Sequence, residues 1–256
     1  MVTVMMTPYW QSDDGAITIY NGDCLDVLRD GAVKFDSVIG DPPYCSGGRQ
    51  QAGARNTIDK SGRGVDGWFL TDNMGGDSYI WWMREIAGEL FRFASNGAHC
   101  YLFTDWRQYT NVVTACETKG WALRGCVVWD KDRGGAMGSF WRNNHEWIPV
   151  FSKGSPAPLP HGSFFNTWRG AKPQGGEHPT AKPEGLVSYL CEAAPGTILD
   201  PWMGSGTTLR AARKLGRKAI GIESDRRYCD IAIASLGAIT PERAAEPAGP
   251  LFSRAS

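Results

Sequence analysis

Hydrophobic residues in this chain fall into short β-like runs and longer helix-like repeats that follow one another in turn. Short runs rich in branched and aromatic residues predict strands, and repeats at three- and four-residue spacing predict helices. The predicted strands are Ala16–Tyr20, Phe35–Gly40, Gly97–Thr104, Leu123–Asp130, Glu146–Ser152, Thr197–Asp200 and Lys218–Ser224. The predicted helices are Ser78–Ala94, Tyr109–Lys119, Glu184–Ala194, Thr207–Leu215 and Arg226–Leu236. Strands that alternate with helices indicate an α/β domain with a largely parallel sheet.

The clearest helical repeat lies in residues 78–94. One side of this helix carries Ile80, Met83, Ala87, Leu90 and Phe91. Because these positions recur at helical spacing, we expect them to face the core.

Two long segments interrupt the alternation and are expected to be loops. Residues 45–65 are glycine-rich with a net charge of +3, and residues 152–183 contain six prolines, also with a net charge of +3. Loops of this length inside a compact domain are usually functional or disordered. We therefore expect one domain over residues 1–239, with insertions at 45–77 and 131–144 and a small segment at 152–177. Residues 240–256 have little to bury and are expected to form a flexible tail.

Composition excludes several classes of protein. No apolar run approaches the roughly 20 residues of a membrane span, and residues 1–12 lack the basic residues of a signal peptide, so a cytoplasmic protein without membrane contact is expected. The 27 basic and 27 acidic residues cancel, which excludes a generally basic nucleic-acid coat but allows a local basic face. The seven cysteines form no CxxC pair and the four histidines are scattered. Reduced, mostly buried thiols and no metal site are therefore expected.

Residues 197–208 predict a buried strand, a tight glycine turn and the start of a helix. Such a turn lets backbone approach a ligand closely, and the helix start offers unpaired N–H groups. Leu209 replaces the third glycine of a dinucleotide loop, and no lysine follows Gly206 as in a Walker loop. Glu223 lies near the end of the next predicted strand, 17 positions after Gly206, where an acid accepts hydrogen bonds from ribose hydroxyls.

Asp41-Pro42-Pro43-Tyr44 follows another predicted strand. The prolines could simply end that strand. However, the Asp41 carboxylate and the Pro42 carbonyl are both acceptors for an exocyclic amine, and proline has no N–H to compete. Tyr44 supplies a flat face on which an extruded base can stack. This segment therefore suits methylation of a base amino group by positioning, without a strong base.

Five segments, in order, resemble the S-adenosylmethionine-dependent DNA amino-methyltransferases, which carry D/N/S-P-P-Y/F. Residues 21–25 (NGDCL) look like the acidic turn beside the cofactor adenine, and residues 41–44 match the catalytic motif. Residues 144–154 (NHEWIPVFSKG) look like the strand bordering the target-base pocket. Residues 178–183 (HPTAKP) are similar to the element that helps hold the methionine end of the cofactor. Residues 200–208 (DPWMGSGTT) resemble the cofactor loop, with Trp202 where Phe is usual.

The resemblance spans roughly residues 16–236 and implies a Rossmann-like seven-stranded class I methyltransferase. The catalytic motif precedes the cofactor loop, which is the circularly permuted order called the beta class. The implied catalytic residues are Asp41, Pro42, Pro43 and Tyr44. The implied S-adenosylmethionine-binding residues are Asp23, Cys24, Asp41, His178, Thr180, Lys182, Asp200, Pro201, Trp202, Gly204, Ser205, Gly206, Thr207, Thr208, Glu223 and Ser224.

Larger relatives place a target-recognition domain where this chain has only the segment between Ser152 and His178. Site selection is therefore expected to fall to this segment and to the loops at 45–65 and 131–144. The expected contacts to double-stranded DNA are Arg49, Arg55, Lys60, Arg63, Arg133, Trp141, Arg142, Arg169 and Lys172. Trp141 and Trp168 either stack on bases or only cover the core.

The resemblance implies methylation of the N6 amino group of adenine, because DPPY usually accompanies adenine in this family. Three alternatives stay open: an N4-cytosine DNA methyltransferase, an RNA-directed methyltransferase, and a degenerate DNA-binding member without activity. A homodimer and a cognate restriction endonuclease are further partners that the resemblance allows.

Overall fold

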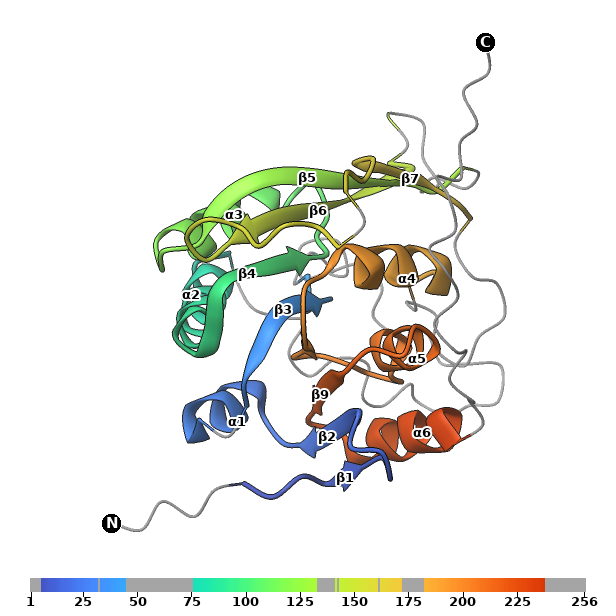
Figure 1. The fold of residues 1–256 in the computed structure, drawn as a ribbon. Helices are drawn as coiled ribbons and strands as arrows, with labels where there is room; N and C mark the ends of the chain where they lie inside the picture. Colours follow the sequence, from blue (N-terminus) through green and yellow to red (C-terminus); the bar gives the residue numbers. More distant parts are fainter. Residues whose placement is uncertain are drawn as a thin grey trace, which may run out of the picture.

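The computed structural model describes residues 6–31, 33–44, 76–132, 141, 143–160, 162–171 and 182–237. Within these ranges, nine strands form one sheet in the order β1-β2-β9-β8-β3-β4-β6-β5-β7 (Figure 1). The strands are β1 (Trp10–Gln11), β2 (Ile17–Asn21), β3 (Phe35–Gly40), β4 (Ala94–Leu102), β5 (Ala122–Asp130), β6 (His145–Ser152), β7 (Thr167–Arg169), β8 (Ile198–Asp200) and β9 (Ala219–Glu223). The helices are α1 (Cys24–Asp30), α2 (Gly76–Phe93), α3 (Tyr109–Glu117), α4 (Glu184–Ala193), α5 (Thr207–Lys214) and α6 (Arg226–Gly237).

The middle of the sheet is parallel, from β2 through β9, β8 and β3 to β4. Strands β6 and β5 continue the sheet antiparallel, β7 pairs parallel with β5, and β1 pairs antiparallel with β2. Strands β8 and β9 come late in the chain but lie between β2 and β3. The carboxyl ends of β3, β8 and β9 therefore meet at one edge of the sheet.

Helices cover both faces of the sheet. In Figure 1, α1, α2 and α3 lie on one side and α4, α5 and α6 on the other. Two buried clusters correspond to these layers, and the neighbouring residues Val38 and Ile39 of β3 belong to one cluster each. Successive side chains of a strand point to opposite faces, so a strand covered on both faces is apolar throughout. This explains the run Phe35–Gly40, in which only Asp36 and Ser37 are polar.

All seven strands and five helices predicted from the sequence are present, with small differences at their ends. The structure adds β1, β7 and α1, which were not predicted. The two added strands are two and three residues long, and α1 has seven residues, too few to show a hydrophobic period.

The predicted apolar face of α2 is partly wrong. Met83, Ala87 and Leu90 are buried as expected, but Tyr79 and Ile86 are also fully buried. Ile80 and Phe91 are only half-buried. The helix is therefore rotated relative to the predicted stripe, because it packs against α1 and α3 as well as the sheet.

Several expectations lie outside the described residues. They include most of the insertions at 45–77 and 131–144, the tail at 240–256 and Cys45. The other six cysteines are free thiols, five of them buried. Within the described ranges, no helix has both the length and the apolar character needed to cross a membrane.

Candidate functional site

The site lies at the edge of the sheet where β3, β8 and β9 end. These three strands are followed by or end in acids: Asp41 follows β3, Asp200 ends β8 and Glu223 ends β9. The end of β3 packs directly against the segment after β8. Gly40 allows this contact, because a Cβ at position 40 would lie only 2.9 Å from the Trp202 ring. The segment that carries Asp41 and the glycine turn are thus in direct contact.

Glu223 organises the glycine turn. Its Oε2 accepts a hydrogen bond from the Gly204 N–H at 3.1 Å, and its Oε1 accepts from the Asp225 N–H at 2.8 Å and the Ser224 hydroxyl at 3.3 Å. Gly204 and Gly206 both adopt left-handed backbone, at φ +50° and +83°. Gly206 caps α5 without a side-chain hydrogen bond, so the first N–H groups of that helix face the turn. Glu223 therefore shapes the turn, a role the sequence did not indicate.

Asp200 is almost fully buried beneath this turn. Burial raises the pKa of its carboxyl to about 7, although hydrogen bonds from the Thr208 hydroxyl and the Trp202 N–H oppose the shift. The Trp202 N–H bond is 3.1 Å long. The Trp202 ring lies 5.9 Å from that of Trp82, and its buried indole N–H has no hydrogen-bond partner in the part of the chain described. The Trp202 side chain nevertheless interacts with the Cys24 thiol, and this interaction opposes the rise of the Cys24 pKa.

The segment Asn21–Cys24 lies beside the end of β9. The Asn21 amide donates to the carbonyls of Glu223 and Ser224, at 2.9 and 3.1 Å. Asp23 caps α1 by accepting the Leu25 N–H at 2.8 Å, and its side chain is exposed. Cys24 is buried, and burial raises its pKa to about 12, so it remains a thiol. The residues just before Asp23 and Cys24 therefore lie beside the end of β9, and the expected contact of Asp23 and Cys24 with the cofactor stays a prediction.

Asp41 and Tyr44 are joined by a cluster of charged side chains. Lys182 Nζ lies 2.8 Å from Asp41 Oδ2 and 3.4 Å from Glu146 Oε2. Tyr44 donates its hydroxyl to Glu146 Oε2 at 3.0 Å, and Lys131 Nζ lies 2.8 Å from Glu146 Oε1. The Lys182 ammonium also lies 5.0 Å from the centre of the Tyr44 ring. Among the described residues, the buried Oδ1 of Asp41 has no hydrogen-bond partner.

Burial and charge act against each other in this cluster. Burial raises the pKa of Asp41 although Lys182 opposes the shift, and burial raises the pKa of Tyr44 well above its usual value. Burial disfavours the Lys182 cation, but Asp41 and Glu146 outweigh this and raise its pKa. The pKa of Glu146 is lowered because Lys182 and Lys131 outweigh its burial. At neutral pH Tyr44 is therefore neutral, while Lys182 and Glu146 are charged.

The structure places the other sequence-predicted residues as follows. Pro42 is buried and Pro43 half-buried beside Asp41, and Pro201, Ser205 and Thr207 belong to the glycine turn or the start of α5. Nine predicted residues lie outside the described part of the chain: Arg49, Arg55, Lys60, Arg63, Arg133, Arg142, Lys172, His178 and Thr180.

Two of the expected DNA contacts, Arg169 and Trp141, lie within the described residues. Arg169 pairs with Asp130 at 2.9 Å, and Trp141 is 84% exposed. Trp168 packs on the second core cluster and lies against Gly170, where a Cβ would be 2.3 Å from its ring. This packing supports the interpretation that Trp168 covers the core rather than stacks on bases.

Lys131 and Glu146 were not among the predicted site residues. Glu146 was visible as the one acid within the otherwise largely apolar strand β6. A buried acid in a strand requires a partner, which is a signal that the sequence offered.

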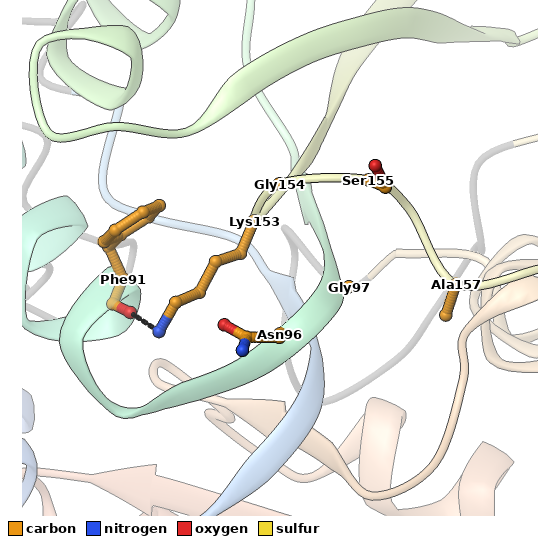
Figure 2. A pocket seen from close by; sticks show the side chains of 7 residues that line it. All are labelled: Phe91, Asn96, Gly97, Lys153, Gly154, Ser155 and Ala157. Atoms are coloured by element: carbon orange, nitrogen blue, oxygen red, sulfur yellow. Dashed lines mark hydrogen bonds between the residues drawn. The ribbon is translucent and has the colours of Figure 1, made fainter.

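A surface pocket lies at the opposite edge of the sheet, at the start of β4 and the end of β6 (Figure 2). Phe91, Asn96, Gly97 and Lys153 are among its lining residues. Lys153 donates to the carbonyls of Phe91 and Ala94, at 2.7 and 2.8 Å, and so satisfies the end of α2. This pocket is separate from the strand ends that carry Asp41, Asp200 and Glu223.

Comparison with known proteins gives consistent matches. The family model for DNA methylases of the N6/N4 type matches residues 35–167 and 157–234. The type II methyltransferase M2.MboI of Moraxella bovis is 27% identical over 268 residues, covering 91% of this chain and 92% of that protein.

Solved structures share the fold. The M1.HpyAVI–SAM complex is 21% identical with a TM-score of 0.63, and the match covers 86% of this chain and 100% of that chain. PvuII DNA methyltransferase, described as cytosine-N4-specific, is 13% identical with a TM-score of 0.64 over 93% of this chain and 98% of that chain. Because the family model covers most of its length, this chain belongs to the N6/N4 DNA methylase family.

Proposed function

We propose that this DNA methyltransferase transfers the methyl group of S-adenosylmethionine to the N6 amino group of an adenine flipped out of duplex DNA. The observation that carries the proposal is Asp41 Oδ1, a buried acceptor without a hydrogen-bond partner among the described residues, on a side chain that interacts with that of Tyr44. A buried acceptor left unpaired costs stability unless a donor arrives, and an exocyclic amine is such a donor.

The residues around the glycine turn fit S-adenosylmethionine, which supplies an electrophilic methyl group when bound. A Cβ at Gly204 would meet nothing within 4 Å, so the turn is open on its outer side. Glu223 and Ser224 offer polar atoms to ribose hydroxyls, and the start of α5 offers N–H groups to an anionic group. The residues proposed to hold the cofactor are Asp23, Cys24, Asp41, Lys182, Asp200, Pro201, Trp202, Gly204, Ser205, Gly206, Thr207, Thr208, Glu223 and Ser224, together with His178 and Thr180.

Asp41, Pro42 and Tyr44 would orient the base. The Asp41 carboxylate and the Pro42 carbonyl accept the two hydrogens of the amine, and the Tyr44 ring stacks on the base. The amine loses a proton only after its nitrogen has gained a methyl group and become cationic. Positioning and electrostatics, rather than a strong base, therefore lower the barrier.

Mass spectrometry of digested nucleosides tests the reaction and the target base together. Unmethylated duplex DNA is incubated with the protein and S-adenosylmethionine, and N6-methyladenine is expected. N4-methylcytosine would keep the mechanism but overturn the target base. Cofactor binding without either product would contradict DNA methylation by this chain, and RNA substrates would then be assayed.

Asp41→Asn tests the role of the carboxylate. We expect the single-turnover rate to fall by at least about 100-fold, because one acceptor oxygen becomes an amide nitrogen. Cofactor affinity should stay within about tenfold. The control is Asp26→Asn, an exposed acid of α1 that carries the same change of charge. A variant at Asp41 that turns over at the rate of the control would contradict the proposed role.

A further inference from the structure

We infer that Glu146 is a positioning residue for this reaction, which holds the Tyr44 hydroxyl and shares Lys182 with Asp41, leaving an Asp41 oxygen available to the target amine. The inference rests on the proposed function and assigns to it a residue of β6 that does not itself touch the reacting atoms.

The first part of the argument concerns Tyr44. Its hydroxyl donates to Glu146 Oε2 at 3.0 Å. A bond from a phenol to an ionised carboxylate is stronger than one between neutral groups, and it fixes the ring in orientation. A ring that is held before the base arrives loses less conformational freedom when the base stacks on it.

The second part concerns Lys182, whose side chain is only 10% exposed. Its ammonium lies between two carboxylates, 2.8 Å from Asp41 and 3.4 Å from Glu146. If Asp41 were the only partner of Lys182, the ammonium group would interact with both Asp41 oxygens. It would then compete with the target amine for these acceptors. Because Glu146 takes a share of Lys182, Asp41 keeps Oδ1 free of hydrogen-bond partners within the described residues.

The third part concerns the balance of charge. Lys131 approaches the other oxygen of Glu146 at 2.8 Å, so each Glu146 oxygen has a donor. The cluster holds two carboxylates and two ammonium groups, with side chains of 10–33% exposure. Asp200 is a further acid that interacts with Asp41. Glu146 therefore lies at the centre of this cluster and contacts Lys182, Lys131 and the Tyr44 hydroxyl.

The test uses the full-length protein with saturating DNA and cofactor. Glu146→Gln keeps an acceptor for Tyr44 but removes the charge, and we expect the single-turnover rate to fall by about 10- to 100-fold. The dissociation constant for S-adenosylmethionine should change less than about threefold. Glu117→Gln, an exposed acid of α3, is the matched control and should retain the wild-type rate.

The pH profile separates positioning from packing. Removal of the Glu146 charge takes a negative neighbour from Asp41 and leaves Lys182 to Asp41 alone, and both changes favour the ionised carboxylate. The acid limb of the rate profile should therefore move to lower pH while the plateau falls. A packing defect would lower the plateau and leave the acid limb in place, which would overturn the inference.

A double-mutant cycle tests the Tyr44 contact without any need for activity. Melting temperatures are compared for wild type, Tyr44→Phe, Glu146→Ala, which removes the acceptor altogether, and the double variant. The shift of the double variant should be smaller than the sum of the single shifts, because both changes affect the same hydrogen bond. Additive shifts would contradict the contact, whereas a wild-type protein that methylates no nucleic acid would contradict the proposed function alone.

Discussion

A buried ammonium group needs negatively charged partners within a few ångströms, because it has lost its hydration. Lys182 has two such partners, carboxylates on separate parts of the sheet. Asp41 follows β3 and Glu146 belongs to β6, while Lys182 lies just before α4. Because desolvation of charges is expensive, such a group stabilises the fold only when all its partners are present.

Removal of Lys182 should therefore be strongly destabilising. Lys182→Met leaves Asp41 without its cation, and we expect the free energy of unfolding to fall by about 3–5 kcal/mol. Lys214→Met is the control, because its exposed pair with Glu184 should contribute at most about 1 kcal/mol. Urea unfolding measures both. Equal losses in the two variants would show that burial of Lys182 carries no special cost.

Asp200 should make stability fall as pH rises. Its pKa is raised from 3.8 to about 7 by burial, so the native state holds the proton more tightly than the unfolded chain. The stabilisation from protonation is complete below about pH 4 and is lost as pH rises to about 7. Asparagine cannot ionise, so Asp200→Asn should gain stability relative to wild type over this window, by up to about 4 kcal/mol. Unfolding by urea at a series of pH values across this window would reveal the trend, and a constant difference between the proteins would contradict it.

At the level of single elements, the start of α5 depends on close contact with α6. Gly206 has φ +83°, and a Cβ there would lie 2.8 Å from that of Ala232. Both the left-handed backbone and the contact require glycine at this position.

Gly206→Ala should lower the free energy of unfolding by about 2–4 kcal/mol, because strain and overpacking add. Gly216→Ala is the matched control: it has φ +62° but nothing within 4 Å of a built Cβ, so only about 1 kcal/mol is expected. Thermal unfolding of both variants gives the difference. A Gly216 variant as unstable as the Gly206 variant would show that helix contact is unimportant here.

The sequence predicts the longer elements well, because a buried parallel strand or an amphipathic helix carries its own hydrophobic pattern. The short strands β1 and β7 form because they pair with a neighbouring strand. Segments of two or three residues are too short to show a hydrophobic pattern that would predict this pairing. The same limit applies to the site. Asp41 and Glu223 are candidates because they lie at the ends of predicted strands, where α/β sheets bind their ligands, whereas Asp200 is implied by the resemblance. The bonds from Glu146 to Tyr44 and Lys182 join residues 102 and 36 positions apart, and only the fold brings them together.

For the whole molecule, the absence of net charge means that DNA binding must depend on local basic segments. The basic residues of the segment 45–65 are predicted to bind phosphates: Arg49, Arg55, Lys60 and Arg63. Replacing all four with glutamine should reduce the slope of log K against log salt by about 0.9 for each phosphate that the protein no longer neutralises.

Arg169→Gln serves as the comparison, since the guanidinium already pairs with Asp130. It should alter the slope by much less than the fourfold variant, and neither change should affect S-adenosylmethionine affinity. Salt titrations of DNA binding by fluorescence anisotropy measure the slopes. An unchanged slope in the fourfold variant would exclude this segment from the DNA-binding surface. The circularly permuted order, the homodimer and the cognate endonuclease stay predictions.

Hydrogen bonds join the N-terminal segment around Tyr9 to helix α6, and this contact has a consequence for how such a gene can be rearranged. The Tyr9 hydroxyl donates to Asp230 Oδ1 at 2.7 Å and accepts from Arg226 Nε at 2.9 Å, so the segment before β2 lies against α6. A short peptide could join these neighbouring segments, and new ends could be opened between β6 and β7. The resulting gene would encode the glycine turn before the Asp41 segment, yet every strand would keep its neighbours. The order of the motifs along the chain therefore depends on where its two termini lie. The site itself depends on how the strands are arranged in the sheet.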